Sequence, residues 1–296
     1  MSRGLGVGKE TTFGTAVAAQ KWYNIIREDI TARKTILFDD DTVVSRQILK
    51  GTRGTESVEG RIELYLNSQQ IGHLLKSLLG DENVSGSGPY THTFSVADTL
   101  PSLTIRSILD DIREKIATGC VIDTLEIVSE IGRPRVIATV LGRQLTLGTP
   151  STPTFPTQDD FLHGEASITL AGTTKKPRRL TLRIANNLDV VNVLGDFYPV
   201  KIQPRKLRVT GSFDLNFESD AEYQDFLSLN QRSLNIKFIK GSHSIEFDIS
   251  TFAYTSANVE VRGRELLVGS FEFEAIKPTT QDAVKVVLVN DDSTAY

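Results

Sequence analysis

The residue types that most often carry chemistry are scarce and widely spaced in this chain. Its 296 residues include one cysteine, Cys120, and four histidines, which are His73, His92, His163 and His243. A single thiol can form neither an intrachain disulfide nor a multi-thiolate metal site, and no two of the histidines stand at a spacing typical of metal ligands. Because no nucleophile motif accompanies them, the sequence predicts neither an enzyme nor a site for a metal or cofactor.

Three short segments resemble binding motifs but lack the context that such motifs require. Gly4–Lys9 is rich in glycine like a phosphate-binding loop, yet no strand precedes it to aim the loop, so a flexible arm is favoured. Asp39-Asp40-Asp41 lacks the alternating ligands and central glycine of a calcium loop, which favours a solvated acidic turn. Lys175–Arg179 is basic but has no interleaved aromatic residues for base stacking, which leaves a solvated turn or a partner-contact loop.

Length and charge exclude further classes of protein. At roughly 150 residues per domain, the length suggests two domains. The 33 Lys and Arg residues and 37 Asp and Glu residues give a formal net charge of −4, whereas tight wrapping of nucleic acid needs a basic face that releases counterions. No apolar run reaches the roughly 18 residues of a membrane span, and the N-terminus lacks an apolar signal core. We therefore expect a soluble, β-rich protein that is made in the cytoplasm.

The elements that would position these residues begin with a strand followed by a helix. From Val58 to Leu66 apolar and polar residues alternate with a period of two, which is typical of a half-buried strand. Ser68 then offers an N-cap, leucines recur at helical spacing and Gly80 ends the pattern, which predicts an amphipathic helix over residues 68–79. Alternating segments elsewhere predict further strands, at residues 90–96, 103–109, 121–128, 135–141, 180–184, 207–217, 234–239, 244–249 and 266–275.

The composition along the chain predicts five consecutive regions. Three prolines within residues 148–156 make a stiff, extended connector that we interpret as the domain boundary. The predicted regions are an N-terminal arm (1–20), a first β module (21–147), a Pro/Thr-rich linker (148–160), a second β module (161–277) and a C-terminal tail (278–296).

The second half of the sequence repeats the plan of the first. Val58–Ser68 aligns with Val209–Ser219 at an offset of 151, and in both copies a strand with an interior glycine runs into a helix. Leu103–Arg106 aligns with Leu234–Lys237 at an offset of 131, so about 20 residues are inserted in the first copy, with residues 80–102 as the candidate. The alternative is that any two antiparallel β domains share such alternation. A duplicated module would let one chain occupy two equivalent positions in a ring.

Taken in order, these segments resemble the tail tube proteins of long-tailed, siphovirus-like bacteriophages, of the two-domain kind. The resemblance is spread over nearly the whole chain. It rests on Phe13–Val17, on Arg53 and Val58–Gly60 before the helix that ends in Leu78-Leu79-Gly80, and on Tyr90–Phe94, Leu100–Ile105, Leu182–Leu188 and Val209–Phe213.

This resemblance implies a mainly β fold of two tandem tail-tube-type β-sandwich or barrel modules, each with one flanking α-helix. It implies trimeric rings of pseudo-sixfold symmetry whose sheets join into an inner barrel and which stack into the hollow tube of the virion tail. The implied partners are further copies of the chain, a tape measure protein, and tail terminator and baseplate proteins. DNA would pass through the lumen without specific binding during genome delivery, and no membrane is involved.

The charged segment from Asp39 to Glu56 is predicted to be a long exposed loop or extended hairpin. We expect it to contact the next ring of the tube through the charged residues Asp39, Asp40, Asp41, Arg46, Lys50 and Arg53. Other readings remain open: a baseplate or head–tail joining protein of the virion, a ligand-binding β-sandwich, and a hydrolase on a β scaffold. Trp22 is the only tryptophan, so a planar set of exposed aromatic residues for sugar binding is poorly supported.

Overall fold

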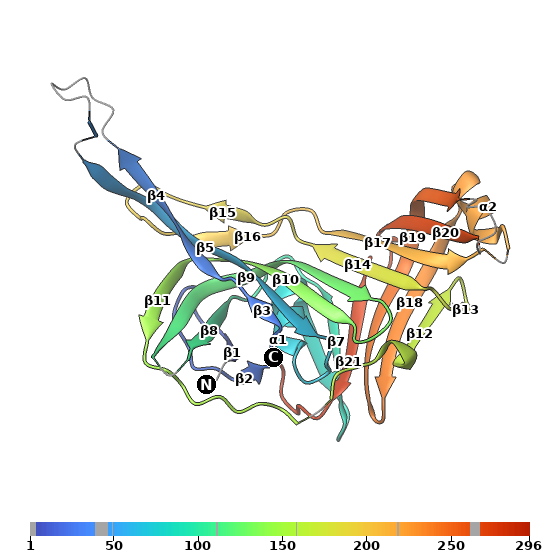
Figure 1. The fold of residues 1–296 in the computed structure, drawn as a ribbon, viewed down its shortest axis with the longest axis horizontal. Coiled ribbons are helices and arrows are strands. Elements are labelled where there is room, and N and C mark those ends of the chain that lie inside the picture. Colours follow the sequence, from blue (N-terminus) through green and yellow to red (C-terminus); the bar gives the residue numbers. More distant parts are fainter. Residues whose placement is uncertain are drawn as a thin grey trace.

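The computed structural model describes residues 4–38, 47–48, 50–110, 112–157, 159–217, 219–260 and 267–296, with the side chain of Glu260 excepted. Strands dominate this part of the chain, and only two α-helices occur in it. The predicted mainly β class is therefore confirmed. Figure 1 shows most of the second half of the chain, in orange and red, beside the first half, with the β4–β5 hairpin projecting beyond the body.

The first half contains a series of antiparallel strands and one helix. Its elements are β1 (Leu5–Lys9), β2 (Lys21–Tyr23), β3 (Arg27–Glu28), β4 (Thr31–Phe38), β5 (Gly51–Tyr65), α1 (Gly72–Leu79), β6 (Gly80–Ser85), β7 (Tyr90–Val96), β8 (Leu103–Leu109), β9 (Arg113–Ser129), β10 (Arg135–Gly142) and β11 (Gln144–Gly148).

The second half has the same kind of composition. Its elements are a short 3-10 helix (His163–Glu165), β12 (Ala166–Leu170), β13 (Thr173–Lys175), β14 (Arg179–Ala185), β15 (Asp189–Val191), β16 (Lys201–Gln203), β17 (Arg208–Asn216), α2 (Ala221–Leu227), β18 (Gln231–Lys240), β19 (His243–Glu260), β20 (Val268–Ala275) and β21 (Lys285–Asn290).

The order of strand pairing in the first half recurs in the second. In the first half β5 pairs with β10, β10 with β9, and β9 with β8 and β11. In the second half β17 pairs with β20, β20 with β19, and β19 with β18 and β21. The repeat seen in the sequence is thus visible as one pairing scheme used twice, and α1 and α2 occupy the same place in it. The boundaries proposed for the two modules stay a prediction.

The predicted insertion corresponds to a discrete hairpin. Strands β6 and β7 pair with each other within residues 80–102, on either side of Gly86–Pro89. The second half has no hairpin between α2 and β18, whose described residues follow one another directly. The alignment offset between the two copies therefore changes within residues 80–102, where the sequence alignment placed the insertion.

Alternation of apolar residues accounts for the core. Ile62 and Leu64 of β5 and Phe271 and Phe273 of β20 are almost fully buried, while the residues between them face outward. The helix α1 buries its leucines, but it begins at Gly72 rather than near Ser68, and its N-cap Ile71 makes no side-chain hydrogen bond. Ser68 lies buried in the preceding turn, so tertiary packing overrides the predicted cap.

The N-terminal segment belongs partly to the core. Leu5 and Val7 of β1 are fully buried, and β1 pairs with β2 and β8. The buried carboxylate of Glu10 accepts hydrogen bonds from the N–H groups of Gly14 (2.8 Å) and Gly119 (2.9 Å). The expectation of a flexible arm over residues 1–20 therefore does not hold between Leu5 and Gly14.

Close packing explains the glycines that resembled a phosphate-binding loop. A Cβ atom on Gly8 would lie 2.3 Å from the carbonyl oxygen of Ala18. Glycine therefore allows the returning chain to lie directly against β1. This is a packing role within a sheet, and the segment has no loop that could hold a phosphate.

The C-terminal region also joins the sheet. β21 lies between β19 and β7 and so pairs with a strand from each half of the chain. Val286 and Leu288 of β21 are fully buried. The predicted C-terminal tail (278–296) thus contains a core strand, whereas residues 149–157 of the predicted linker form no helix or strand.

Candidate functional site at the joints between the two halves

Of the cysteine and histidines singled out in the sequence, His73 and His92 come together around Tyr296, while Cys120 and His163 lie elsewhere. Within the described residues no group of three or more His, Cys, Asp or Glu side chains could hold a metal ion. Cys120 is fully buried, and burial raises the pKa of its thiol, so the thiol stays protonated. His163 is exposed beside the backbone of Gly132. In the same part of the chain no helix is long and apolar enough to span a membrane.

The first joint is a strand pairing between the two halves. Leu180–Ala185 of β14 pairs antiparallel with Thr124–Ser129 of β9, one residue opposite another over six positions. Because β9 also pairs with β10 and β14 with β17, a continuous sheet runs across the joint in the order β4, β5, β10, β9, β14, β17, β20, β19. Two copies of the same strand scheme are therefore joined edge to edge.

Asn186 supports this joint from inside the protein. Its side-chain amide is buried and donates hydrogen bonds to the carbonyl oxygens of Leu78 (2.9 Å) and Ile122 (3.1 Å). Its backbone N–H donates to the carbonyl of Asp123 (2.8 Å). Asn186 thus binds both the C-terminal end of α1 and the part of β9 around Asp123, where the pairing register between β9 and β10 shifts.

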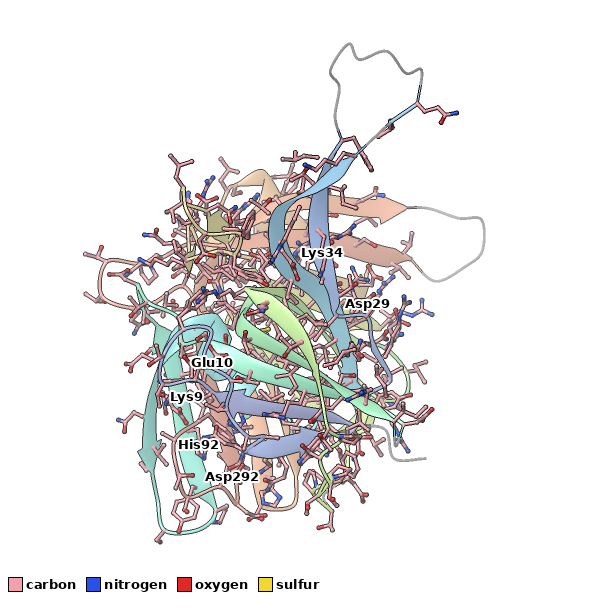
Figure 2. The ribbon with its side chains drawn as sticks, turned by 90° about the vertical axis from the view of Figure 1, so that its left-hand side faces the viewer. Lys9, Glu10, Asp29, Lys34, His92 and Asp292 are labelled. Atoms are coloured by element: carbon pink, nitrogen blue, oxygen red, sulfur yellow. The ribbon has the colours of Figure 1, made fainter. Side chains whose placement is uncertain are left out.

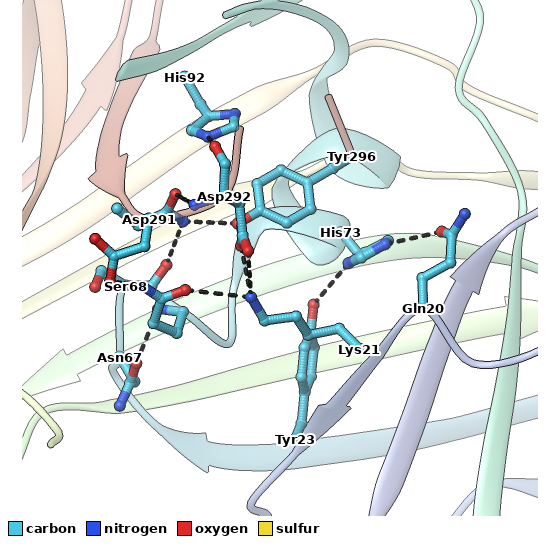
Figure 3. A network of polar contacts seen from close by, with 12 residues as sticks. Gln20, Lys21, Tyr23, Asn67, Ser68, His73, His92, Asp291, Asp292 and Tyr296 are labelled. Atoms are coloured by element: carbon cyan, nitrogen blue, oxygen red, sulfur yellow. Dashed lines mark hydrogen bonds and ion pairs between the residues drawn. The ribbon is translucent and has the colours of Figure 1, made fainter. Parts of the chain in front are cut away.

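The second joint is a buried polar network around the last described residues of the chain (Figure 3). Tyr296 packs against the rings of His73 and His92, with centroid distances of 4.9 and 5.0 Å. Its hydroxyl donates to a carboxylate oxygen of Asp292 and accepts a hydrogen bond from the amide of Asn290 (2.6 Å). The segment that follows β21 is therefore held against α1 and β7 of the first half.

Lys21, Tyr23 and His73 extend the network toward β2. The ammonium of Lys21 binds Asp292 at 2.6 Å. His73 lies between the Tyr23 hydroxyl, 3.3 Å from its Nδ1, and the Gln20 side-chain oxygen, 3.0 Å from its Nε2. Burial, helped by the charge of Lys21, lowers the pKa of His73 to about 4, so the ring is neutral at pH 7.

His92 has the opposite electrostatic environment. Burial lowers the pKa of His92, but hydrogen bonds to Glu82 (2.8 Å) and to the carbonyl of Asp292 (2.8 Å) outweigh it, so that the pKa is raised. Both ring nitrogens face oxygen acceptors, which favours the doubly protonated ring. The buried His92–Glu82 pair lies within the inserted β6–β7 hairpin, and the hairpin is bound to the C-terminal segment by His92 at the carbonyl of Asp292 and by Glu82 at the N–H of Tyr296.

This polar network holds distant segments of the chain together. Its acids, bases and hydroxyls are hydrogen-bonded to one another, and these contacts join residues 200 or more positions apart in the sequence. Two polar hollows on the described surface are lined by other residues, one by Lys277 and Asp282 and the other by Glu126 and Arg183. Sequence reasoning missed Asn186, Asp292 and Tyr296, because isolated polar residues carry no local signal of burial.

A third contact between the halves is made by the arm of residues 189–203, which contains β15 and β16. The N–H of Glu56 donates to the carbonyl of Phe197 (2.8 Å), and the Arg53 guanidinium lies over the ring of Phe197, 4.8 Å from its centroid. The Gln144 amide donates to the Tyr198 hydroxyl (3.0 Å). Figure 1 shows this arm, in yellow, reaching back over the first half beside the β4–β5 hairpin.

The predicted inter-ring contact loop is only partly described. Asp39, Asp40, Asp41 and Arg46 lie outside the described residues, and Lys50 is exposed. Arg53 belongs to β5 and packs against the arm of the second half. The contact between rings therefore stays a prediction, while Arg53 has an observed role within the chain.

A known protein family matches this chain. The family model described as phage tail tube protein matches residues 2–275, which is nearly the whole chain. The chain therefore belongs to the phage tail tube protein family, a family of structural components of phage tails that assemble into a tube. A search of the curated proteins found no match.

Proposed function

We propose that this protein is the repeating subunit of a bacteriophage tail tube, and that three copies close into a ring of pseudo-sixfold symmetry. The observation that carries this proposal is the pairing of β14 with β9, which joins two equivalent units edge to edge within one chain. A chain that already contains one such joint needs only further copies of it to extend the sheet. Three chains of two units each would present six equivalent positions around an axis.

The free edges of the sheet support closure into a ring. An unpaired strand edge exposes backbone N–H and C=O groups and invites pairing with another chain. A barrel removes such edges altogether because each strand gains a neighbour on both sides. Contacts of the heterologous kind between rings then give a filament, which is the geometry of a tube.

We infer that the polar face of this sheet lines the lumen. Several of its arginines have carboxylate partners, for example Arg208 with Glu274 (2.7 Å) and Arg135 with Glu63 (3.1 Å). Affinity for DNA comes chiefly from cations that neutralise phosphates and release counterions. Arginines already matched by carboxylates, in a chain of net charge −4, would let DNA pass without being held.

The remaining roles follow from assembly. The segment of Asp39, Asp40, Asp41, Arg46, Lys50 and Arg53 is proposed to contact the next ring. The tube is proposed to hold a tape measure protein inside it and to contact terminator and baseplate proteins at its ends. It is also proposed to serve as the conduit for genome delivery. The role is structural rather than catalytic, and the protein would reside in the virion tail.

Electron microscopy of the purified full chain tests the proposal. We expect rings of three chains, and stacked tubes as the protein concentration rises, with six similar lobes in class averages. Mass photometry of the same samples should show a species of three chains. Single chains persisting at high concentration under all salt conditions would refute the proposal.

A further inference from the structure

Two strand edges lie open at opposite ends of the sheet that crosses the joint. From Tyr254 onward β19 pairs with β20 on one side, and within the described residues no strand pairs with its other side. At the far end, β3 and residues 31–34 of β4 pair with β5, and no other strand among the described residues pairs with their free side. Side chains of the same chain bind the backbone of Ile30, whose N–H donates to the Glu28 carboxylate (2.8 Å) and whose carbonyl accepts from the Lys115 ammonium (3.1 Å). Figure 2 shows Asp29 and Lys34 along this free end, well away from His92 and Asp292 of the second joint.

The first joint, which is the internal joint between β9 and β14 of one chain, identifies which residues near β3 and β4 correspond to β14. Leu182 of β14 lies opposite Gly211 of β17. In the repeat Gly211 corresponds to Gly60 of β5, and Ile30 lies opposite Gly60, since a Cβ on Gly60 would be 2.4 Å from the Cα of Ile30. Ile30 therefore occupies the place of Leu182, and both side chains are buried.

The same reasoning identifies which residues of β19 correspond to β9. Ile127 of β9 lies opposite Val136 of β10, which lies opposite Leu64 of β5. In the second half Val259 of β19 lies opposite Gly269 of β20, which lies opposite Leu215 of β17. Leu64 and Leu215 are equivalent in the repeat, so Val259 occupies the place of Ile127.

We propose that the open edge of β19 pairs antiparallel with residues 30–33 of a second copy of this chain, in the register of the internal joint. Because Leu182 pairs with Ile127 within the chain, Ile30 of one copy pairs with Val259 of the next. Thr31 then lies opposite Asn258, and Ala32 opposite Ala257. This inference rests on the proposed ring and names the surface and register of its contact between chains.

The chemistry of the two edges fits this register. Ile30 and Ala32 would meet Val259 and Ala257 on the core side of the sheet, where the internal joint places Leu182 and Ile184 against Ile127 and Leu125. On the polar face, Thr31 would meet Asn258, as Arg183 meets Glu126 within the chain. A shift by one residue would place every side chain on the wrong face, so a buried face specifies register strongly.

Cysteine pairs test the register directly. The variant Thr31→Cys/Asn258→Cys places two cysteines opposite each other on the strands proposed to pair. Opposite residues on paired strands have Cα atoms about 4.5–5.5 Å apart, which a disulfide can span. Diamide oxidises the two thiols to one disulfide and takes up their two electrons and two protons. We expect covalent dimers and trimers on denaturing gels after oxidation of assembled protein. The native Cys120 is fully buried and is retained.

A matched control moves one cysteine to the neighbouring strand on the same face. Ser270 of β20 lies opposite Asn258 of β19 and is exposed. The pair Thr31→Cys/Ser270→Cys would therefore be about 10 Å apart across two strand spacings, too far for a disulfide. The two single-cysteine variants should also give no ladder. The pair Ala32→Cys/Ala257→Cys serves as a second test of the same register with small residues.

The outcomes separate this inference from the proposed function. Cross-linking of both matched pairs, without cross-linking of the control pair, supports the register. Rings or tubes in the microscope without cross-linking of either matched pair would overturn the proposed contact and leave the tube function in place. Cross-linking of the control pair instead would also overturn it. An unmodified protein that forms neither rings nor tubes would refute the proposed function itself.

Discussion

At the scale of single residues, the two buried histidines of the joint illustrate how environment sets charge. His73 is neutral because burial and nearby lysines disfavour the charged ring, whereas His92 faces acceptors at both nitrogens, including Glu82. The raised pKa of His92 contributes stability that is complete below the unfolded pKa near 6.5 and lost as pH rises through the folded pKa. The lowered pKa of His73 acts in the opposite direction.

Acid should therefore destabilise the joint through His73. An unfolded histidine binds a proton near pH 6.5, while folded His73 does so near pH 4, so its contribution is complete above pH 6.5 and lost as pH falls toward 4. The difference corresponds to about 3 kcal/mol. In urea titrations at pH 7 and pH 4, His73→Gln should lose less stability on acidification than the unmodified protein. His163→Gln, at an exposed site, is the control, and equal pH dependence of all three proteins would contradict the prediction.

Replacing Asn186 should lower the free energy of unfolding more than replacing the exposed Asn216. Asn186→Ala removes donors from two buried carbonyls, those of Leu78 and Ile122, and such unsatisfied groups typically cost about 1–3 kcal/mol. The measurement is the free energy of unfolding in denaturant. Asn216→Ala, at an exposed strand end, should change it by about 0.5 kcal/mol or less. A similar small change for both variants would show that Asn186 does not support the joint.

At the scale of elements, the two halves use the same scheme but differ where the chain joins them. Among the residues that the structure describes, the β6–β7 hairpin has no counterpart in the second half, and it pairs with β21, which belongs to the second half. The arm of residues 189–203 crosses in the other direction and covers β5 near Arg53. The joint within a chain is thus reinforced by contacts beyond the pairing of β9 with β14.

Removal of the Arg53 side chain should loosen this arm without unfolding the protein. Arg53→Ala removes cation–π contacts with Phe197 and Tyr198, which at exposed sites contribute about 0.5–1 kcal/mol. We expect faster limited proteolysis within residues 192–200, followed by mass spectrometry of the fragments. Arg27→Ala, a change on the same sheet but away from the arm, should leave the cleavage rate unchanged. Equal cleavage rates in both variants would mean that Arg53 does not hold the arm.

At the scale of the whole molecule, one sheet runs through both halves and ends in two open edges. The internal joint, the second joint around Tyr296 and the arm together fix the two halves relative to each other. Rigid placement matters for a ring, because small errors in the angle between units would add up around it and prevent closure. A chain with two pre-joined units also has fewer contacts left to form by association.

Local patterns predicted much of the secondary structure because burial in a half-exposed sheet leaves a period of two. The strand at Val58–Leu66, the strand at Tyr90–Val96 and the repeat itself followed from such patterns, whereas β6 did not. The helix start was misplaced, because Ser68 has the right local chemistry for a cap but is used in a buried turn. The N-terminal glycines suggested flexibility, although they allow close packing in β1.

The sequence by itself determined the mainly β class, the duplication and the lack of a recognisable catalytic or metal motif, because these depend on periodicity and residue type along the chain. Only the tertiary structure decided which edges meet, since strand pairing joins segments far apart in sequence and depends on shape as well as pattern. The pairing of β14 with β9 and the burial of Asn186, Asp292 and Tyr296 are of this kind. Backbone hydrogen bonds form between any compatible strands, so no short motif specifies their partners.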